Sequence, residues 1–204
     1  MTVTGLEPCT KTKYKVYLDG EFAFVLYKGE LTRFGIREGG EIQDGTAEKI
    51  RSEVLLKRAK LRAMHLLEDM DRTEAALRDK LLQGLCPPDI AQEAIEYVRS
   101  FGYVDDARFA ENFIRSRQGT RSRREIRAAL LKKGVSAELI DQAFEACYDE
   151  SSEEAAIRRL LQKKKFDPGH IREEERQKLY AHLARKGFRY ETVRQVIQNY
   201  EYDA

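Results

Sequence analysis

A glycine-containing turn that recurs about every 50 residues is the feature of this sequence that most limits its possible folds. Gly84, Gly134 and Gly187 are each followed by an apolar residue, and more apolar residues stand six and ten positions after each glycine. A glycine just beyond a helix adopts the left-handed backbone conformation without steric cost, and the apolar residue behind it can pack back on the last turn. We therefore predict that each glycine ends one helix and leads into the next.

The spacing of apolar residues on both sides of these turns is that of amphipathic helices, so each repeat is expected to hold three helices. The predicted units span residues 59–101, 105–148 and 153–200. Ser122 and Glu125 have the spacing of a capping box, which marks the start of the middle helix of the second unit. Units of this size bury little apolar surface alone. We therefore expect a mainly α fold in which three tandem three-helix repeats stack into an elongated, curved array.

The first 46 residues have a different pattern. Apolar residues alternate over 14–18 and over 22–26, with Asp19 and Gly20 between the two runs. Alternation is typical of strands, and an Asp-Gly pair supplies the positive φ angles of a tight type I′ turn, so the segment is predicted to form a β-hairpin. An isolated hairpin is only marginally stable in water, and this one should gain a partner strand or pack against another element.

A long helix is predicted to begin near Ala47, because Ile50, Val54, Leu61 and Leu66 stand at helical spacings. This helix leads into the first repeat. We therefore divide the chain into an N-terminal hairpin segment, a first helical repeat with its leading helix, and two further helical repeats. The predicted bounds of these four parts are 1–46, 47–104, 105–150 and 151–204.

Charged residues make up 35% of the chain, above the roughly 25% of an average globular protein, and this favours helices with solvated faces over a deeply buried sheet. The three cysteines are far apart and odd in number, which indicates reduced thiols in a cytoplasmic protein. There is no apolar leader and no run of the ~20 apolar residues that a membrane span needs. We therefore expect a soluble protein that contacts no membrane.

Catalytic motifs are absent from the sequence. His65, His170 and His182 share no metal-ligand spacing, and the phosphate-binding and zinc-protease motifs do not occur. Asp105 and Asp106 are the adjacent carboxylates most worth testing as a metal or acid–base site. At the start of a helix, however, acidic residues accept hydrogen bonds from free N–H groups and complement the helix dipole, and we interpret the pair in this way. We predict that the protein is not an enzyme and uses no cofactor or metal ion.

Charge is unevenly distributed, although the formal net charge is only +2. Residues 107–135 contain nine basic side chains and two acidic ones, whereas residues 138–154 contain seven acidic side chains and no basic one. A basic segment centred on a helix–turn–helix is what contact with phosphate groups requires, and the planar fork of arginine suits bidentate recognition. The candidate binding residues are Arg115, Arg117, Arg121, Arg123, Arg124, Arg127, Lys132 and Lys133.

A solvated helix face is the alternative explanation of this basic segment, with ion pairs to the acidic helix that follows, and charge alone leaves both readings open. A second basic cluster, Lys163–Lys165, is interpreted as a helix end that complements the dipole. Phe109 and Phe113 stand four residues apart, and we interpret them as core residues rather than as platforms for base stacking.

One segment resembles the signature of the bacterial RecX family, whose members regulate the RecA recombinase; it reads Gly102-Tyr-Val-Asp-Asp-Ala-Arg-Phe-Ala-Glu-Asn-Phe-Ile-Arg-Ser-Arg117. A following stretch, Leu130-Leu-Lys-Lys-Gly-Val135, is similar to a helix end of the same family. Val104 stands where the family more often has leucine or isoleucine. The resemblance covers some two-thirds of the chain, from 59 to 200. The positions that match the family motif are Gly102, Asp105, Asp106, Phe109 and Ala110.

The resemblance implies three tandem three-helix repeats, binding to the RecA–DNA filament along its groove, and modulation, commonly inhibition, of recombinase activity and strand exchange. It also suggests that the segment 115–133 contacts filament DNA or an acidic surface of the recombinase. The implied partners are the RecA filament and the single- or double-stranded DNA reached through it, bound by a monomer. Two alternatives remain open, a helix–turn–helix DNA-binding regulator that acts without recombinase and an adaptor that binds only protein.

Overall fold

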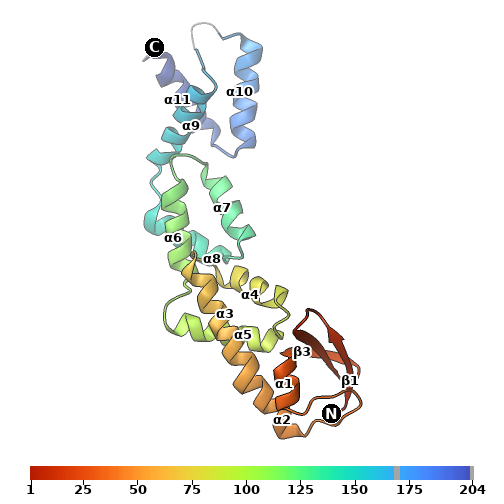
Figure 1. The fold of residues 1–204 in the computed structure, drawn as a ribbon. Helices are drawn as coiled ribbons and strands as arrows, with labels where there is room; N and C mark the ends of the chain where they lie inside the picture. The colour runs from red at the N-terminus through yellow and green to blue at the C-terminus, as the bar shows by residue number, and fades with distance from the viewer. Residues whose placement is uncertain (168–170, 203–204) are drawn as a thin grey trace. The chain divides into compact units, whose positions relative to one another are not determined.

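A computed structural model describes residues 1–167 and 171–202 of the chain, so His170 lies outside the described residues. The chain forms two compact units, Met1–Asp105 and Asp106–Ala204. The first unit holds a small sheet and one three-helix repeat, and the second holds two three-helix repeats (Figure 1). The predicted mainly α architecture is therefore confirmed. Within the described part of the chain, no helix combines the length and the apolar character needed to cross a membrane.

The predicted hairpin is confirmed and gains a third strand. Strands β2 (Lys13–Leu18) and β3 (Glu21–Tyr27) pair in antiparallel fashion around Asp19 and Gly20, whose φ angles of 49° and 91° are both positive, as a type I′ turn requires. Strand β1 (Val3–Pro8) pairs with the other edge of β2, which gives the sheet order β1-β2-β3. The third strand supplies the pairing that a lone hairpin lacks.

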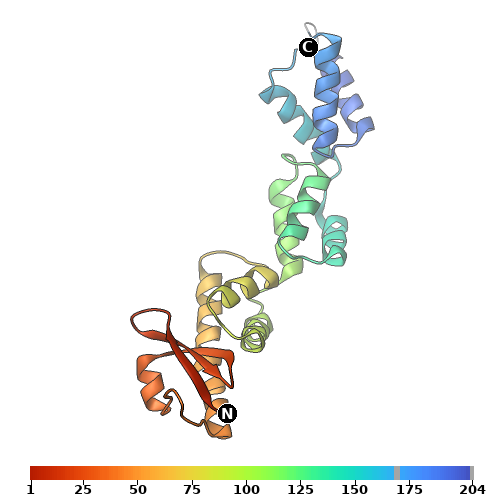
Figure 2. The ribbon, with the colours of Figure 1, turned by 90° about the vertical axis from the view of Figure 1, so that its right-hand side faces the viewer.

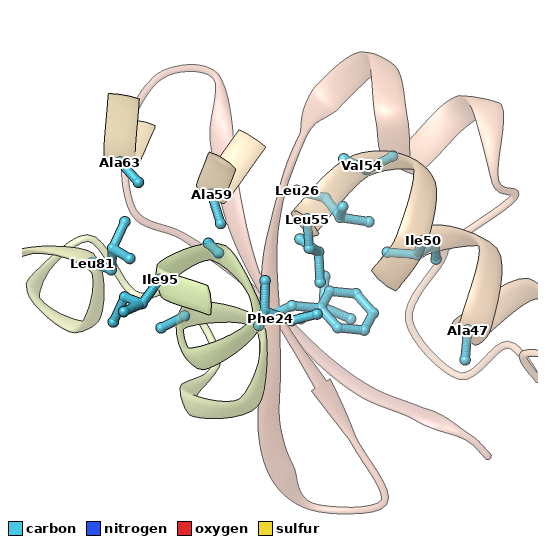
Figure 3. Close-up of a cluster of buried hydrophobic side chains, with 14 of the residues drawn as sticks. Phe24, Leu26, Ala47, Ile50, Val54, Leu55, Ala59, Ala63, Leu81 and Ile95 are labelled. Carbon is cyan, nitrogen blue, oxygen red and sulfur yellow. The ribbon is translucent and has the colours of Figure 1, made fainter. Parts of the chain in front are cut away.

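One face of the sheet is buried against helices of the same unit. Val16 and Leu26 have no exposed surface, and Phe24 is 3% exposed. These side chains belong to one core with residues of the long helix that follows, including Ile50 and Leu55, as Figure 3 shows. Figure 2 shows the sheet lying against this helix. Burying such side chains stabilises the fold by about 1.5–3 kcal/mol each, and the sheet and the first repeat share this one core.

The long opening helix is confirmed, but the prediction that Leu61 lies on its buried face is wrong. The chain is helical from 44 to 68 as α2 (Asp44–Lys49), a π-helical segment η1 (Ile50–Leu56) and α3 (Lys57–Glu68). Leu61, predicted on the buried face, is 60% exposed. A π-helical turn holds more residues than an α-helical turn, so the residues after it are rotated about the helix axis relative to the prediction. The buried positions after the π-helical segment are therefore Ala59 and Ala63. The prediction failed because it assumed the α-helical period throughout.

Further helices complete the first unit. Helix α1 (Lys28–Arg33) follows the sheet. The helices α4 (Glu74–Gln83) and α5 (Pro88–Ser100) pack with α3 to form the first repeat. Thr73 caps α4, as its side-chain oxygen accepts a hydrogen bond from the N–H of Ala76.

The second unit contains two repeats, each with a core of its own. Ile114, Ile126 and Leu130 are fully buried in the second repeat, and Leu161 and Leu183 are fully buried in the third. The helices of the second repeat are α6 (Asp106–Arg117), α7 (Arg123–Lys132) and α8 (Ala137–Cys147). The helices of the third repeat are α9 (Ser151–Lys163), α10 (Glu173–Arg185) and α11 (Tyr190–Tyr202).

In the first repeat, the positive-φ residue of the helix-ending turn lies one position later than predicted. Gly134 and Gly187 have positive φ angles of 81° and 87°, as predicted, whereas the residue with positive φ after α4 is Leu85, at 60°. Gly84 itself has φ −80°. The N–H of Cys86 then bonds to the carbonyl of Leu81 at 3.2 Å, the same closure that Val135 makes to Leu130 and Phe188 makes to Leu183. Leu85 is thus the equivalent of the two later glycines.

Replacing Leu85 with glycine is expected to leave the first unit about 0.5–1 kcal/mol more stable than replacing it with alanine. A left-handed conformation costs a side-chain-bearing residue about 1–2 kcal/mol, and glycine avoids that cost but loses more chain entropy on folding. Leu85 is 38% exposed, so both variants lose the partial burial of its side chain, and the difference between them reports on the backbone. Urea unfolding at an unchanged m-value measures the difference. The control is Leu85→Ala, which shortens the side chain without relieving the backbone; equal destabilisation by both variants would show that the strain is negligible.

Candidate nucleic-acid interface of the second repeat

The apolar faces of α6 and α7 determine where the basic side chains lie. Ala110 and Ile114 of α6 and Ile126 of α7 point into the core of the second repeat and have no exposed surface. Seven of the eight candidate binding residues are consequently exposed, and Arg127 is half-buried. The turn between the helices, 118–122, brings the end of α6 and the start of α7 together, so that several of these cations lie at one turn.

The predicted capping box fixes the start of α7. The hydroxyl of Ser122 accepts a hydrogen bond from the N–H of Glu125 at 3.1 Å, and the Glu125 carboxylate accepts one from the N–H of Ser122 at 3.3 Å. Ser122 is fully buried, and its hydroxyl donates to the carbonyl of Lys186 at 2.5 Å. The ammonium of Lys186 in turn pairs with Glu125 at 3.2 Å. The start of α7 is thereby joined to the end of α10 in the third repeat.

Two of the candidate arginines form ion pairs. Arg115 pairs with Glu111 one turn earlier on α6, at 2.9 Å. The guanidinium of Arg127 contacts both carboxylate oxygens of Asp141 on α8, and its hydrogen bond lowers the pKa of Asp141 below the usual value for an aspartate. These are contacts of the kind that the solvated-face alternative predicts. Arg115 and Arg127 therefore have a carboxylate partner already.

Aromatic rings lie beneath three more of the cations. The guanidinium of Arg123 lies 4.7 Å from the ring centre of Phe144 and 5.5 Å from that of Tyr148. Lys133 and Arg117 both lie over Phe113, at 5.8 and 5.7 Å. A ring face attracts a cation without neutralising its charge, so such contacts orient Arg117 and Arg123 and leave them able to bind an anion.

The two phenylalanines of α6 pack as predicted, with an addition. Phe109 and Phe113 are partly buried against the core of the second repeat, and their rings stack with centres 6.2 Å apart. Lys133 lies over both of them. Because the core and the cations already occupy both sides of the pair, these rings offer little surface to a nucleic-acid base.

The remaining three candidates differ among themselves. Arg124 packs against Gly187, because a Cβ atom built on Gly187 would lie 2.7 Å from the Cβ and Cδ atoms of Arg124. Arg121 and Lys132 make no side-chain ion pair or hydrogen bond with any residue in the described ranges 1–167 and 171–202. The structure therefore separates a structural arginine, Arg124, from cations that are open to solvent.

The motif residues Gly102 to Ala110 span the turn after α5 and the first residues of α6. Gly102 has φ +70° just after α5, and Ala110 is fully buried in the second repeat. Asp105 directly precedes α6 and Asp106 is its first residue, where acidic side chains complement the helix dipole. Among the residues that the structure describes, no group of three or more histidine, cysteine or acidic side chains could hold a metal ion.

Sequence reasoning missed the contacts between distant segments. The link from Ser122 to Lys186 joins residues 64 positions apart, and the rings under Arg123 come from α8. Local spacing carries no signal for such pairs. The contact between Gly187 and Arg124 becomes visible only when the third repeat is placed against the second.

Family models match the chain in three places. The first three-helix domain of RecX matches residues 59–97, the second matches 105–143, and the third matches 152–197. Each match falls on one of the repeats described above.

Curated relatives are similar over nearly the whole chain. A protein named regulatory protein RecX from Caldanaerobacter subterraneus subsp. tengcongensis is 34% identical over 188 residues, which cover 91% of this chain and 92% of that protein. Its namesake from Clostridium acetobutylicum is 27% identical over 207 residues, covering 97% and 95%.

Solved structures have the same fold. A crystal structure of regulatory protein RecX matches with a TM-score of 0.66 at 22% identity, covering 96% of this chain and 98% of that one. The RecX crystal structure from Lactobacillus salivarius matches with a TM-score of 0.60 at 21% identity, covering 71% and 96%.

Proposed function

Because the chain belongs to the RecX family, we propose that it is a non-enzymatic regulator that binds the RecA–DNA filament and lowers the ATPase and strand-exchange activity of the recombinase. The observation that carries the proposal is the presence of all three family domains along one chain. We further propose that it acts as a cytoplasmic monomer whose parts are 1–46, 47–104, 105–150 and 151–204.

Filament contact is assigned to the candidate cations of the second repeat whose side chains form no ion pair or hydrogen bond with a carboxylate among the described residues. These are Arg117, Arg121, Arg123 and Lys132. An unpaired cation can replace counterions on phosphate, whereas Arg115 and Arg127 would first have to leave Glu111 and Asp141. Arg124 supports the site through its contact with Gly187, and Lys133 through its position over Phe109 and Phe113.

Co-sedimentation with three ligands tests the partner. The ligands are preformed RecA filaments on single-stranded DNA, the same single strand alone, and a duplex of equal length. We expect the tightest binding to the filament, because several repeats can contact successive subunits and gain multivalency. Tight, sequence-specific binding to duplex in the absence of recombinase would instead favour a free-standing DNA-binding regulator. Binding to recombinase without any dependence on DNA would favour a protein adaptor.

A further inference from the structure

A cleft of about 440 Å³ lies in the first unit, outside the basic surface of the second repeat. It is bordered by the turn between β1 and β2, by α3, and by the turn between α4 and α5. It thus lies where the N-terminal sheet meets the first repeat. The basic surface of the second repeat makes no use of it.

The charged side chains that line this cleft are all basic. They are Lys13, Arg58, Arg62 and Lys80, and no aspartate or glutamate lines the cleft. Lys80 bonds to the neutral amide oxygen of Gln83 at 3.3 Å. Arg62 has no hydrogen-bond or ion-pair partner for its side chain in the described part of the chain. A cleft with several cations and no carboxylate on its wall concentrates anionic ligands.

Arg58 is held in place rather than left free. Its guanidinium contacts both carboxylate oxygens of Glu30 at 2.6 Å, donates to the carbonyl of Val25 at 3.0 Å, and lies 4.8 Å from the ring centre of Tyr27. The Glu30 carboxylate therefore neutralises much of the charge of the Arg58 guanidinium. The anion-binding capacity of the cleft therefore rests on Lys13, Arg62 and Lys80.

The floor of the cleft is apolar. Leu55, Ala59 and Leu81 lie beneath it in the buried core of the first unit, as Figure 3 shows, and Val25 and Leu85 supply partly exposed apolar surface. Cys86 lines it as well, and burial raises the pKa of its thiol to about 11, so that the group stays neutral. Leu85, held at φ +60°, forms part of the same wall. A strained backbone persists only where the surroundings hold it, and such positions gather at binding sites.

We propose that this cleft binds a short acidic peptide segment that carries an apolar side chain, supplied by a protein partner. Carboxylates of the segment would pair with Arg62, Lys80 and Lys13, and the apolar side chain would lie on the aliphatic floor. Nucleic acid fits the same cleft poorly. Stacking of bases needs aromatic faces, and no aromatic residue lines the cleft.

Fluorescence anisotropy with the full-length protein tests the proposal. The probe is a fluorescein-labelled 12-residue peptide (of our own design) that consists of aspartate and glutamate around one central leucine. We expect saturable binding that weakens about tenfold or more when the acidic residues become asparagine and glutamine, and also when the leucine becomes serine. Retained affinity of the neutral peptide would overturn the proposal.

Paired substitutions locate the binding. Arg62→Gln with Lys80→Gln should weaken the acidic peptide about tenfold or more, whereas Lys49→Gln with Lys57→Gln removes the same charge outside the cleft and should leave binding within about twofold. Equal loss in both pairs would mean non-specific attraction. Competition by oligothymidylate through Arg62 and Lys80 would identify a nucleic-acid groove instead. Since no recombinase is present, failure here leaves the proposed filament binding standing.

Discussion

Replacing Gly187 with alanine should destabilise the second unit by about 3 kcal/mol. Gly187 has φ +87°, where a residue with a Cβ atom costs about 1–2 kcal/mol more than glycine. The added Cβ would also lie 2.7 Å from the Cβ of Arg124, which is anchored to the backbone of α7 and cannot swing away. Overpacking of this kind typically costs about 1–3 kcal/mol. The clash falls beside the hydrogen bond from Ser122 to Lys186, so both repeats should be affected.

Native-state hydrogen exchange is the suitable measurement, because it reports stability segment by segment. Amide groups in α7 and in α10 should both exchange faster in Gly187→Ala. Gly119→Ala provides the matched control, because Gly119 has φ +75° and open space where its Cβ would stand. It should lose only the backbone contribution of about 1–2 kcal/mol. Equal losses at the two glycines would show that the contact with Arg124 contributes nothing.

Reversing Arg117, Arg121 and Arg123 to glutamate should weaken binding to single-stranded DNA and to the filament on the order of 100-fold at low salt. Each lost phosphate contact reduces the magnitude of the negative slope of log K against log salt concentration by about 0.7 on a single strand. Three lost contacts should therefore reduce it by about 2. Arg124 is left intact because of its contact with Gly187. Anisotropy titrations across a salt series measure both quantities.

Two controls separate phosphate contact from general charge. Reversal of Lys163–Lys165 changes the net charge of the protein by the same amount in the third repeat. We expect this variant to keep most of the salt slope. Replacing Arg127 with glutamine and Asp141 with asparagine removes an ion pair without changing net charge, and should leave binding nearly unchanged. If the turn variant and the lysine variant lose affinity equally, the basic turn is only a solvated face.

Features that depend on local chemistry could be predicted from the sequence. The capping box of Ser122 and Glu125 forms because both partners lie within one turn, and the hairpin turn forms because Asp19 and Gly20 tolerate positive φ. The three-helix repeats follow from apolar spacing for the same reason. Local rules of this kind need no knowledge of the rest of the fold.

Two errors arose where the backbone departs from its usual geometry. Leu61 is exposed because a π-helical segment shifts the buried stripe, and nothing in the residue types of 50–56 indicates that segment. Leu85 takes a conformation that glycine favours although Gly84 stands next to it. In both places the packing of the first unit overrides the local preference.

The basic surface shows a third limit. Its nine cations could be counted in the sequence, but their roles differ with contacts that only the fold provides. Asp141 on α8 pairs with Arg127, Phe144 lies under Arg123, and Gly187 of the third repeat meets Arg124. Charge patterns therefore predict where an interface could be, whereas the three-dimensional contacts rank its residues.

The most direct test of the proposed function is DNA-dependent ATP hydrolysis by RecA on single-stranded DNA, measured while this protein is added up to saturation. If the protein regulates the filament as proposed, hydrolysis and strand exchange should both fall progressively as it is titrated, and the Arg117, Arg121 and Arg123 reversal should require far higher concentrations for the same effect. Undiminished ATP hydrolysis and strand exchange at saturating protein would contradict the proposal.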